Sequence, residues 1–352
     1  MTLNDPNIYW PDYVESNCRQ NYSYFTTSEY LRNGYHIVAL ITIPLSFFTF
    51  YTILRKTPAK MKNMKVPLLI NHAWSTNMDL MFTVYSAPMT FFPSNSGVPL
   101  GILRFLDVPV KWQSWWGQTS ITMMGVCFVM LYENRQSQIT TIKWKIKKKQ
   151  TRILFFAANY VLAFTCMIPF YLDDTPQTEL RKYALERVPC PVIDFYHKSA
   201  YVLVKGNEVT RAISVLGSLC CIMMETFCFM FHTIYHVAVV KNASVSQATK
   251  AMQRRFLKNV SLQISIPFIA IVFPMFYTIY ADQYNYYNQA YNNNAMLTMA
   301  NYGALSTSCC LFIYKPYRDF IIGIATGSGL SGGRAFSSTT AEILTASRIR
   351  GT

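Results

Sequence analysis

Seven long stretches of mostly apolar residues follow one another along the chain, and the segments between them hold nearly all of its charges. Each stretch is long enough to cross a bilayer, whose core of about 30 Å needs roughly 20 apolar residues in a helix. Within the stretches, only Asp79 and Glu225 carry a formal charge. The pattern predicts an all-α membrane protein, a seven-transmembrane helix bundle. The expected spans are residues 35–54, 66–92, 112–132, 153–172, 212–240, 259–281 and 295–314.

The composition supports the same class of protein. Hydrophobic residues make up 51% of the 352 residues, and charged residues make up 14%. Ordinary globular domains carry about 25% charged residues. A single buried helix of a soluble protein could resemble one such stretch, but seven in succession exclude a soluble fold.

The net charge of +15 is distributed unevenly among the segments between the spans. One set holds 22 Lys and Arg against three acidic residues: 55–65, 133–152, 241–258 and 315–352. The other set holds 10 Lys and Arg against 12 acidic residues: 1–34, 93–111, 173–211 and 282–294. Because basic loops stay in the cytosol, we expect an extracellular N-terminus and a cytosolic C-terminus. The basic excess therefore indicates topology and does not indicate a nucleic-acid partner.

Three parts are expected along the chain. They are an extracellular segment at 1–34, a seven-transmembrane domain at 35–322, and a disordered cytosolic tail at 323–352, which is rich in Gly, Ser and Thr. No cleavable signal peptide is visible, so the first span is expected to act as an uncleaved anchor. Residues 315–322 predict a short membrane-parallel helix after the seventh span. The longest outer loop, 173–208, contains three prolines and predicts an ordered cover with little helix.

Two acidic residues at membrane depth are functional candidates, because a carboxylate there is costly. Asp79 belongs to a polar stripe at helical spacing on the second span. The members of that stripe are His72, Ser75, Thr76, Asp79, Thr83 and Ser86. A similar stripe on the fifth span consists of Ser214, Ser218, Cys221, Glu225, Cys228 and His232. Each carboxyl group either ties two helices together, takes part in a conformational switch through an ion or a proton, or contacts a ligand.

The outer third of the predicted bundle is rich in aromatic and amide side chains. Such residues form the interfacial aromatic belt of many membrane proteins, and they also line small-molecule pockets. Both interpretations stay open for each residue. The candidate ligand-binding residues are Trp115, Trp116, Gln118, Tyr277, Tyr280 and Asn294.

No catalytic pattern is present in the sequence. It contains no His-Glu-x-x-His motif, no Gly-rich phosphate loop and no set of Ser, His and Asp suited to nucleophilic catalysis. Its five histidines are scattered over loops and spans. We therefore expect no enzyme activity, no metal and no cofactor.

Two modifications are expected in the extracellular segments. Cys18 and Cys190 are the only cysteines on the oxidising side, so we predict that they form a disulfide. The alternative is two thiols that are free or paired separately. Asn21 begins the only Asn-x-Ser/Thr sequence in an extracellular segment, which predicts glycosylation there.

Six short strings lie at the span boundaries in a fixed order: KTPAKM at 56–61, NHAWSTNMDL at 71–80, FFPSNSGVPLG at 91–101, YENR at 132–135, PCP at 189–191 and KPYRDF at 315–320. From about residue 18 to about residue 322, this series resembles the nematode serpentine receptor class H chemoreceptors. The resemblance implies a chemosensory G-protein-coupled receptor in the plasma membrane of a sensory neuron or its cilium. It further implies a small-molecule ligand, a heterotrimeric G protein and arrestin as partners.

A looser similarity to rhodopsin-like receptors concerns Glu133 and Arg135 at the cytosolic end of the third span. Those receptors carry an acid directly followed by Arg, whereas Asn134 intervenes here. Pro267 and Pro274 interrupt the helix hydrogen bonding of the sixth span and are candidate hinges. Together with Asp79 and Glu225, these four residues are the expected conformational switch.

Basic cytosolic residues are the expected contacts for an acidic G-protein face. They are Arg135, Lys143, Arg254, Arg255 and Lys258. The dense basic stretch 143–149, interleaved with Trp144 and Ile146, also suits anionic membrane lipid. The ligand is expected to be small and largely apolar, because the outer third span carries no carboxylate to pair with an amine.

Two other functions are compatible with seven spans. A ligand-gated chemosensory ion channel of the insect type would place the N-terminus in the cytosol, against the distribution of basic residues. A proton-coupled transporter would use Asp79 and Glu225 as its proton carriers.

Overall fold

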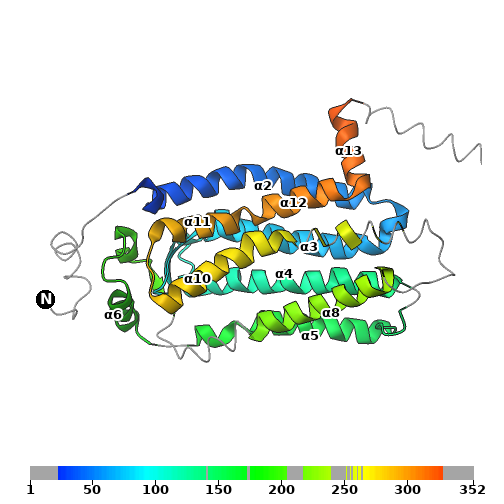
Figure 1. The fold of residues 1–352 in the computed structure, drawn as a ribbon. Helices are drawn as coiled ribbons and strands as arrows, with labels where there is room; N and C mark the ends of the chain where they lie inside the picture. The colour runs from blue at the N-terminus through cyan, green and yellow to red at the C-terminus, as the bar shows by residue number, and fades with distance from the viewer. Residues whose placement is uncertain are drawn as a thin grey trace, which may run out of the picture.

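The computed structural model describes residues 23–139, 142–172, 175–203, 217–238 and 265–327, and also residues 251, 254, 257–259 and 261–262. In this part of the chain, long helices run side by side along one axis (Figure 1). Each expected span coincides with a described helical segment. In chain order these segments are α2 (Ser28–Lys56), α3 (Lys62–Leu80), α4 (Val110–Gln138), α5 (Lys149–Thr165), α8 (Ser218–Ala238), α10 (Phe273–Tyr284) and the pair α11 (Gln289–Ala300) and α12 (Tyr302–Ile313).

Five helical stretches are long and apolar enough to cross a membrane by composition alone: Ser28–Lys56, Lys149–Tyr171, Cys220–Val237, Ser265–Tyr284 and Gln289–Ile313. The α3 and α4 helices have comparable length but carry more polar residues. Many of those polar residues are buried, and α4 packs against α3, α5 and α8. The two less apolar helices therefore belong to the interior of the bundle.

Several buried hydroxyl groups in the bundle donate to backbone carbonyl groups. Thr122 of α4 donates from Oγ1 to the carbonyl oxygen of Ala163 on α5 at 2.8 Å. Thr49 and Thr52 of α2 donate to carbonyl groups one helical turn before them. A buried hydroxyl without such a partner would cost free energy, so these bonds allow polar residues in an apolar layer.

In the part of the chain that the structure describes, two five-residue π-helical turns interrupt the bundle helices. One, η3 (Met81–Tyr85), ends the second span, and the other, η8 (Phe268–Val272), lies between Pro267 and Pro274 of the sixth span. Proline removes a backbone donor and clashes with the preceding turn, so wider turns are expected beside it. The two prolines proposed as hinges therefore flank a local change of helix geometry.

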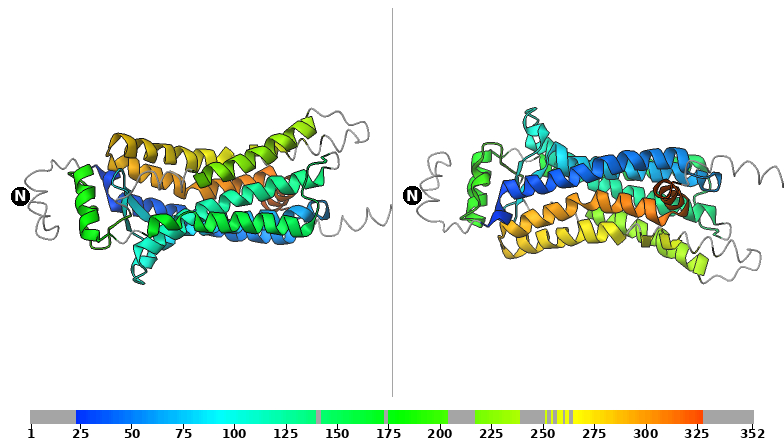
Figure 2. Two further views of the ribbon diagram at one scale, coloured as in Figure 1. Left: turned by 90° about the horizontal axis from the view of Figure 1, so that it is seen from below. Right: turned by 90° about the horizontal axis from the view of Figure 1, so that it is seen from above.

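A small sheet and a short helix close one end of the bundle. The antiparallel strands β1 (Pro88–Phe91), β2 (Ser96–Pro99) and β3 (Tyr201–Val202) lie in that order. Helix α6 (Gln177–Arg187) lies at the same end, beyond the bundle helices (Figures 1 and 2). We call the three strands, α6 and the following turn η6 (Ile193–Tyr196) the cap.

The cap corrects three expectations. The second span ends at Tyr85 and not at residue 92, because Pro88 disfavours a helical Ala87, which has φ 44°. The fold contains strands and is therefore not entirely α-helical. The outer loop contains the 11-residue helix α6, although little helix was expected there.

Helix α13 (Lys315–Ala325) follows the seventh span at the opposite end and runs across the bundle axis (Figure 1). Pro316 lies in its first turn, where a missing N–H costs nothing. Tyr317 is fully buried and contacts the hydroxyl of Thr57 at 2.8 Å. The expected short helix is therefore present and is fastened to the end of α2.

Candidate functional site

An arginine clamp fastens the cap to the sixth span. Arg187 of α6 pairs with Asp282 of α10 at 2.8 Å between Nη1 and Oδ1. The same guanidinium donates to the Asp282 and Pro93 carbonyl oxygens at 2.7 and 3.0 Å and to Asn285 Oδ1 at 2.6 Å. Asn95 in the turn of the hairpin donates to Asp282 Oδ1 at 3.1 Å. One side chain therefore joins α6, the hairpin and the end of α10.

A buried amide ladder joins the cap to the seventh span. Asn292 of α11 donates to the Phe92 carbonyl oxygen at 3.1 Å and accepts from the Tyr277 hydroxyl at 2.9 Å. Gln289 donates to the Thr90 carbonyl oxygen at 3.1 Å and to Asn293 Oδ1 at 2.8 Å. These amides satisfy backbone groups at the end of β1, so part of the amide-rich outer segment holds the cap in place.

Three tryptophans and an asparagine form a cluster between α3 and α4. Trp115 and Trp116 of α4 have ring centroids 6.0 Å apart, and Trp74 of α3 lies 6.1 Å from Trp116. Trp116 donates from Nε1 to Asn77 Oδ1 at 3.2 Å, and the Asn77 amide donates to Ser120 at 2.7 Å. Trp74 and Asn77 are not among the predicted ligand residues, although both lie in the string 71–80.

The six candidate ligand residues do not share one surface. Trp115, Trp116 and Gln118 are partly buried on α4, and Tyr277 is partly buried on α10. Tyr280 is 52% exposed and packs against Tyr284 and Tyr286. Asn294 is exposed and accepts from Tyr30 of α2 at 2.8 Å. The last two therefore lie where an aromatic belt is expected.

Asp79 lies in the interior of the bundle, as its stripe predicts. It is 3% exposed, and His72, Ser75, Thr83 and Ser86 of the same stripe are also buried. Its carboxyl group lies directly against Gly303 of α12, in the space that a Cβ on that glycine would occupy. The contact joins the second and seventh spans. A pattern of polar residues cannot reveal Gly303, because glycine has no side chain.

Glu225 has different surroundings. It is half-buried on α8 and interacts with the side chain of Asn159 on α5. Cys221 and Cys228 of the expected stripe are exposed, and Ser214 lies outside the described residues. The two acidic residues therefore occupy separate helix interfaces.

The end of the bundle that carries α13 contains a second ion pair. Glu133 of α4 is 1% exposed and accepts from Arg152 Nε of α5 at 2.7 Å. The same guanidinium donates to Asn134 Oδ1 at 3.1 Å. Arg135 donates to Gln138 Oε1 at 3.0 Å and interacts electrostatically with Tyr314, which follows α12. The acid of the YENR string thus pairs with Arg152 and not with Arg135, in keeping with the Asn134 that separates the two residues in the sequence.

A polar cavity of about 590 Å³ opens beside this ion pair. It is lined by Asn63, Asn134, Ser137, Gln138 and Arg152. Lys143, Arg254 and Lys258, which are candidate G-protein contacts, are exposed. Arg255 lies outside the described residues.

The expected modifications fall only in part on the described chain. Cys190 is disulfide-bonded, and the seven cysteines of the described spans are free. Cys18 and Asn21 lie outside the described residues, so the Cys18–Cys190 bond and the glycosylation stay predictions. Among the described residues, no group of three or more His, Cys, Asp or Glu could hold a metal.

Comparison with known proteins gives one family. Residues 26–327 match the family described as serpentine type 7TM GPCR chemoreceptor Srh. The chain is also 25% identical, over 319 residues, to a Caenorhabditis elegans protein named serpentine receptor class H-72. That alignment covers 90% of this chain and 92% of the relative.

Proposed function

Because the chain belongs to the Srh family of serpentine seven-transmembrane chemoreceptors, we propose that it binds a small, largely apolar molecule and activates a heterotrimeric G protein. The ligand binds near the capped end, which faces outward, and the G protein binds at the end that carries α13. This orientation follows the distribution of 22 basic residues on one side and 10 on the other. The receptor acts in the plasma membrane of a sensory neuron or its cilium.

The ligand site in this proposal lies below the cap, among the outer ends of the third, fifth, sixth and seventh spans. Trp115, Trp116, Gln118 and Tyr277 supply aromatic surface and a few fixed polar groups, which is the usual chemistry of a small-molecule site. Tyr280 and Asn294 are exposed, so they contact lipid or the rim of the site. The Arg187 clamp joins the cap to α10, so movement of the cap is transmitted to the sixth span.

The observation that carries G-protein coupling is the position of Arg135. It lies at the end of α4, and the neighbouring Glu133 is occupied by Arg152. Its interaction with Tyr314 connects the third and seventh spans. Outward movement of the sixth span would uncover this surface for a partner helix. The exposed Lys143, Arg254 and Lys258 would attract an acidic G-protein face, anionic lipid or arrestin.

A ligand shifts this receptor only if it binds one arrangement of the helices better than another. The π-helical turn between Pro267 and Pro274 supports bending of the sixth span, and the Asp79–Gly303 contact supports a switch between α3 and α12. The simpler interpretation of the prolines is a fixed kink without motion. Variants of Pro267 and Pro274 distinguish a fixed kink from a hinge that bends.

The test is a G-protein dissociation assay in cells that express the chain, with a panel of small volatile organic compounds as probes. Arg135→Ala is expected to abolish the evoked response while surface expression stays unchanged. Lys182→Ala, which removes an exposed cation of α6 at the opposite end of the bundle, is the matched control and is expected to respond like the wild type. Pro274→Ala is expected to reduce the maximal response. An evoked current that survives complete G-protein inactivation would replace the receptor interpretation with a channel.

A further inference from the structure

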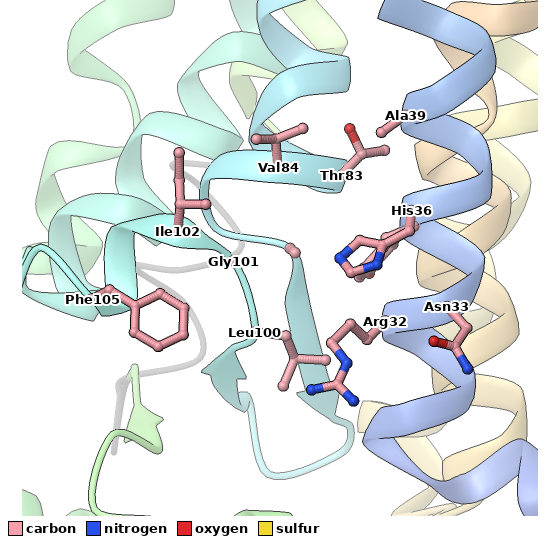
Figure 3. Close-up of a pocket in the computed structure, with 12 residues that line it drawn as sticks. Arg32, Asn33, His36, Ala39, Thr83, Val84, Leu100, Gly101, Ile102 and Phe105 are labelled. Atoms are coloured by element: carbon pink, nitrogen blue, oxygen red, sulfur yellow. The ribbon is translucent and has the colours of Figure 1, made fainter.

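A cavity of about 480 Å³ lies at the side of the bundle, near the capped end. Its wall comes from α2, the turn η3 and residues 100–105, which lead from β2 toward α4 (Figure 3). None of the candidate ligand residues on α4, α10 and α11 lines it. The cavity is therefore separate from the ligand site proposed above.

One side of the cavity is cationic. Arg32 and His36 lie one helical turn apart on α2 and extend toward the hairpin, with Asn33 beside them (Figure 3). All three side chains are exposed. The ion pairs among the described residues are Arg152–Glu133 and Arg187–Asp282, so no described acid neutralises Arg32. A guanidinium in this setting binds a carboxylate or phosphate through two parallel hydrogen bonds.

The opposite side of the cavity is apolar. Leu100, Ile102 and Phe105 line it, and Phe105 and the adjacent Leu106 are 80% and 68% exposed. This segment projects from the side of the bundle at the capped end (Figure 2). Exposed apolar residues of this size in a contiguous segment indicate contact with a membrane or a ligand. The projection therefore suits the boundary between headgroups and acyl chains.

The cavity is built on close backbone contacts. Gly101 packs against the carbonyl groups of Val84 and Tyr85 so closely that a Cβ there would overlap them. Tyr35 donates from its hydroxyl to the Pro88 carbonyl oxygen at 2.7 Å, which holds α2 to the first strand of the hairpin. These contacts fix the cationic and apolar sides in relation to each other, so a ligand meets a preformed site.

We propose that this cavity binds an anionic amphiphile that enters from the bilayer, with its carboxylate or phosphate on Arg32 and His36 and its apolar chain against Leu100 and Phe105. Two sources have this chemistry, a free long-chain fatty acid and an anionic phospholipid. Occupancy joins α2 to the segment that leads to α4, and it thereby stabilises the capped end.

The experiment uses the purified full chain in nanodiscs of zwitterionic phospholipid and a long-chain fatty acid that carries a photoreactive diazirine near the end of its chain. Irradiation is expected to label the peptide that contains Ile102–Leu106. The methyl ester of the same probe is expected to label it about tenfold less, because it lacks the charge. Unlabelled fatty acid or phosphatidylserine, added separately, is expected to displace the probe, and the stronger competitor identifies the source.

Variants decide whether Arg32 and His36 recognise the headgroup. Arg32→Gln combined with His36→Gln is expected to lower labelling about tenfold, since losing the charge-assisted hydrogen bonds of Arg32 weakens binding. Both side chains are exposed, so the fold is retained, and thermal melting verifies this. Arg55→Gln removes an exposed cation at the other end of α2 and is expected to leave labelling unchanged. Equal labelling by acid and ester, failure of both competitors, or wild-type labelling of the double variant would overturn the proposal.

Discussion

At the scale of single residues, the contact between Asp79 and Gly303 leaves less room for a Cβ than any other described glycine has. The carboxyl group fills the space beside the glycine backbone, and both residues lie in helices that carry other buried polar groups. Only Asp79 of this pair can be recognised in the sequence as unusual, because it is an acidic residue within a span. Glycine therefore sets how closely α3 and α12 approach.

We expect Gly303→Ala to destabilise the protein by about 1–3 kcal/mol, the usual cost of overpacking a buried site. Thermal melting of the purified receptor measures the loss. Gly117→Ala is the matched control, because a Cβ on this α4 glycine meets nothing within 4 Å. Adding Asp79→Ala to Gly303→Ala should restore part of the lost stability, as expected for residues in direct contact. Equal melting temperatures for the two glycine variants would contradict the contact.

The two intramembrane acids are expected to differ when neutralised. Asp79→Asn and Glu225→Gln each remove an insertion cost of about 2.5–3.5 kcal/mol, so surface expression should hold or rise. Asp79→Asn alters a buried contact between two spans, and the evoked G-protein response should fall. Glu225→Gln alters a half-buried contact with Asn159 and should have the smaller effect. Unchanged dose–response curves for both variants would leave the carboxyl groups with a structural role only.

We expect His197, which directly follows η6 of the cap, to make the stability of the protein depend on pH. Its Nε2 lies 2.7 Å from Arg104 Nη2, and its Nδ1 accepts from the Ser199 N–H at 3.1 Å. A neutral ring accepts from one donor at a time and a protonated ring from none. Partial burial, then the charges of Arg104 and Lys198, lower the pKa of His197 below its usual value.

Because the folded pKa is the lower one, the unfolded chain binds more protons between the two pKa values. Stability therefore falls as pH decreases below about 6.5, the usual histidine pKa. Hydrogen exchange of residues 193–202 should accelerate between pH 7.5 and 5.5 beyond the intrinsic pH effect. His197→Gln can still accept from Arg104 without titrating, so it should reduce this dependence. A wild-type pH profile in His197→Gln would show that another group is responsible.

At the scale of elements, the Arg187 clamp makes a specific prediction about the cap. Arg187→Ala leaves Asp282 without its partner, at a cost of about 2 kcal/mol for a partly exposed pair, or about 30-fold in local opening. Hydrogen exchange of α6 measures this opening. Arg187→Lys keeps the charge but loses the forked contacts with Asn285. Its hydrogen exchange should therefore lie between that of Arg187→Ala and that of the wild type. Lys182→Ala, an exposed residue of the same helix, should behave like the wild type.

The elements differ in how well the sequence predicts them. A bilayer imposes a minimum apolar length, and five of the described helical stretches meet it by length and composition. The strand β1 is hidden, because its residues Pro88–Phe91 continue the apolar pattern of the second span. Helix α6 is predictable from the sequence, since Gln177–Arg187 contains strong helix formers directly after Pro176.

The sequence predicts some residues of the candidate site but not the residues that they contact. Asp79, Glu133 and Trp116 stand out because such side chains are unusual at their depth in the membrane. Their contact partners do not stand out. Arg152 lies 19 residues after Glu133 in a basic segment where any cation could have been the partner. Gly303 has no side chain to mark it. Pairing between spans depends on helix rotation and offset, which a single sequence does not specify.

At the scale of the whole molecule, one modification tests the orientation on which the functional proposal depends. Three Asn-x-Ser sequences begin at Asn21, Asn242 and Asn259. The Asn259 amide already donates to the Ile313 carbonyl oxygen at 3.1 Å, so it is occupied within the fold. Only Asn21 lies in a segment that the distribution of basic residues places outside.

We therefore expect the receptor expressed in animal cells to show a glycosidase-sensitive shift on a gel, and Asn21→Gln to abolish it. Asn242→Gln is the control and should leave the shift intact, because its loop belongs to the basic set. An inverted bundle would reverse the two results, since Asn242 would then face the secretory lumen and Asn21 the cytosol. The cap would lie inside the cell in that case. The Arg187 clamp would then act on a cytosolic surface, and the ligand site below the cap would have no access to an external odorant.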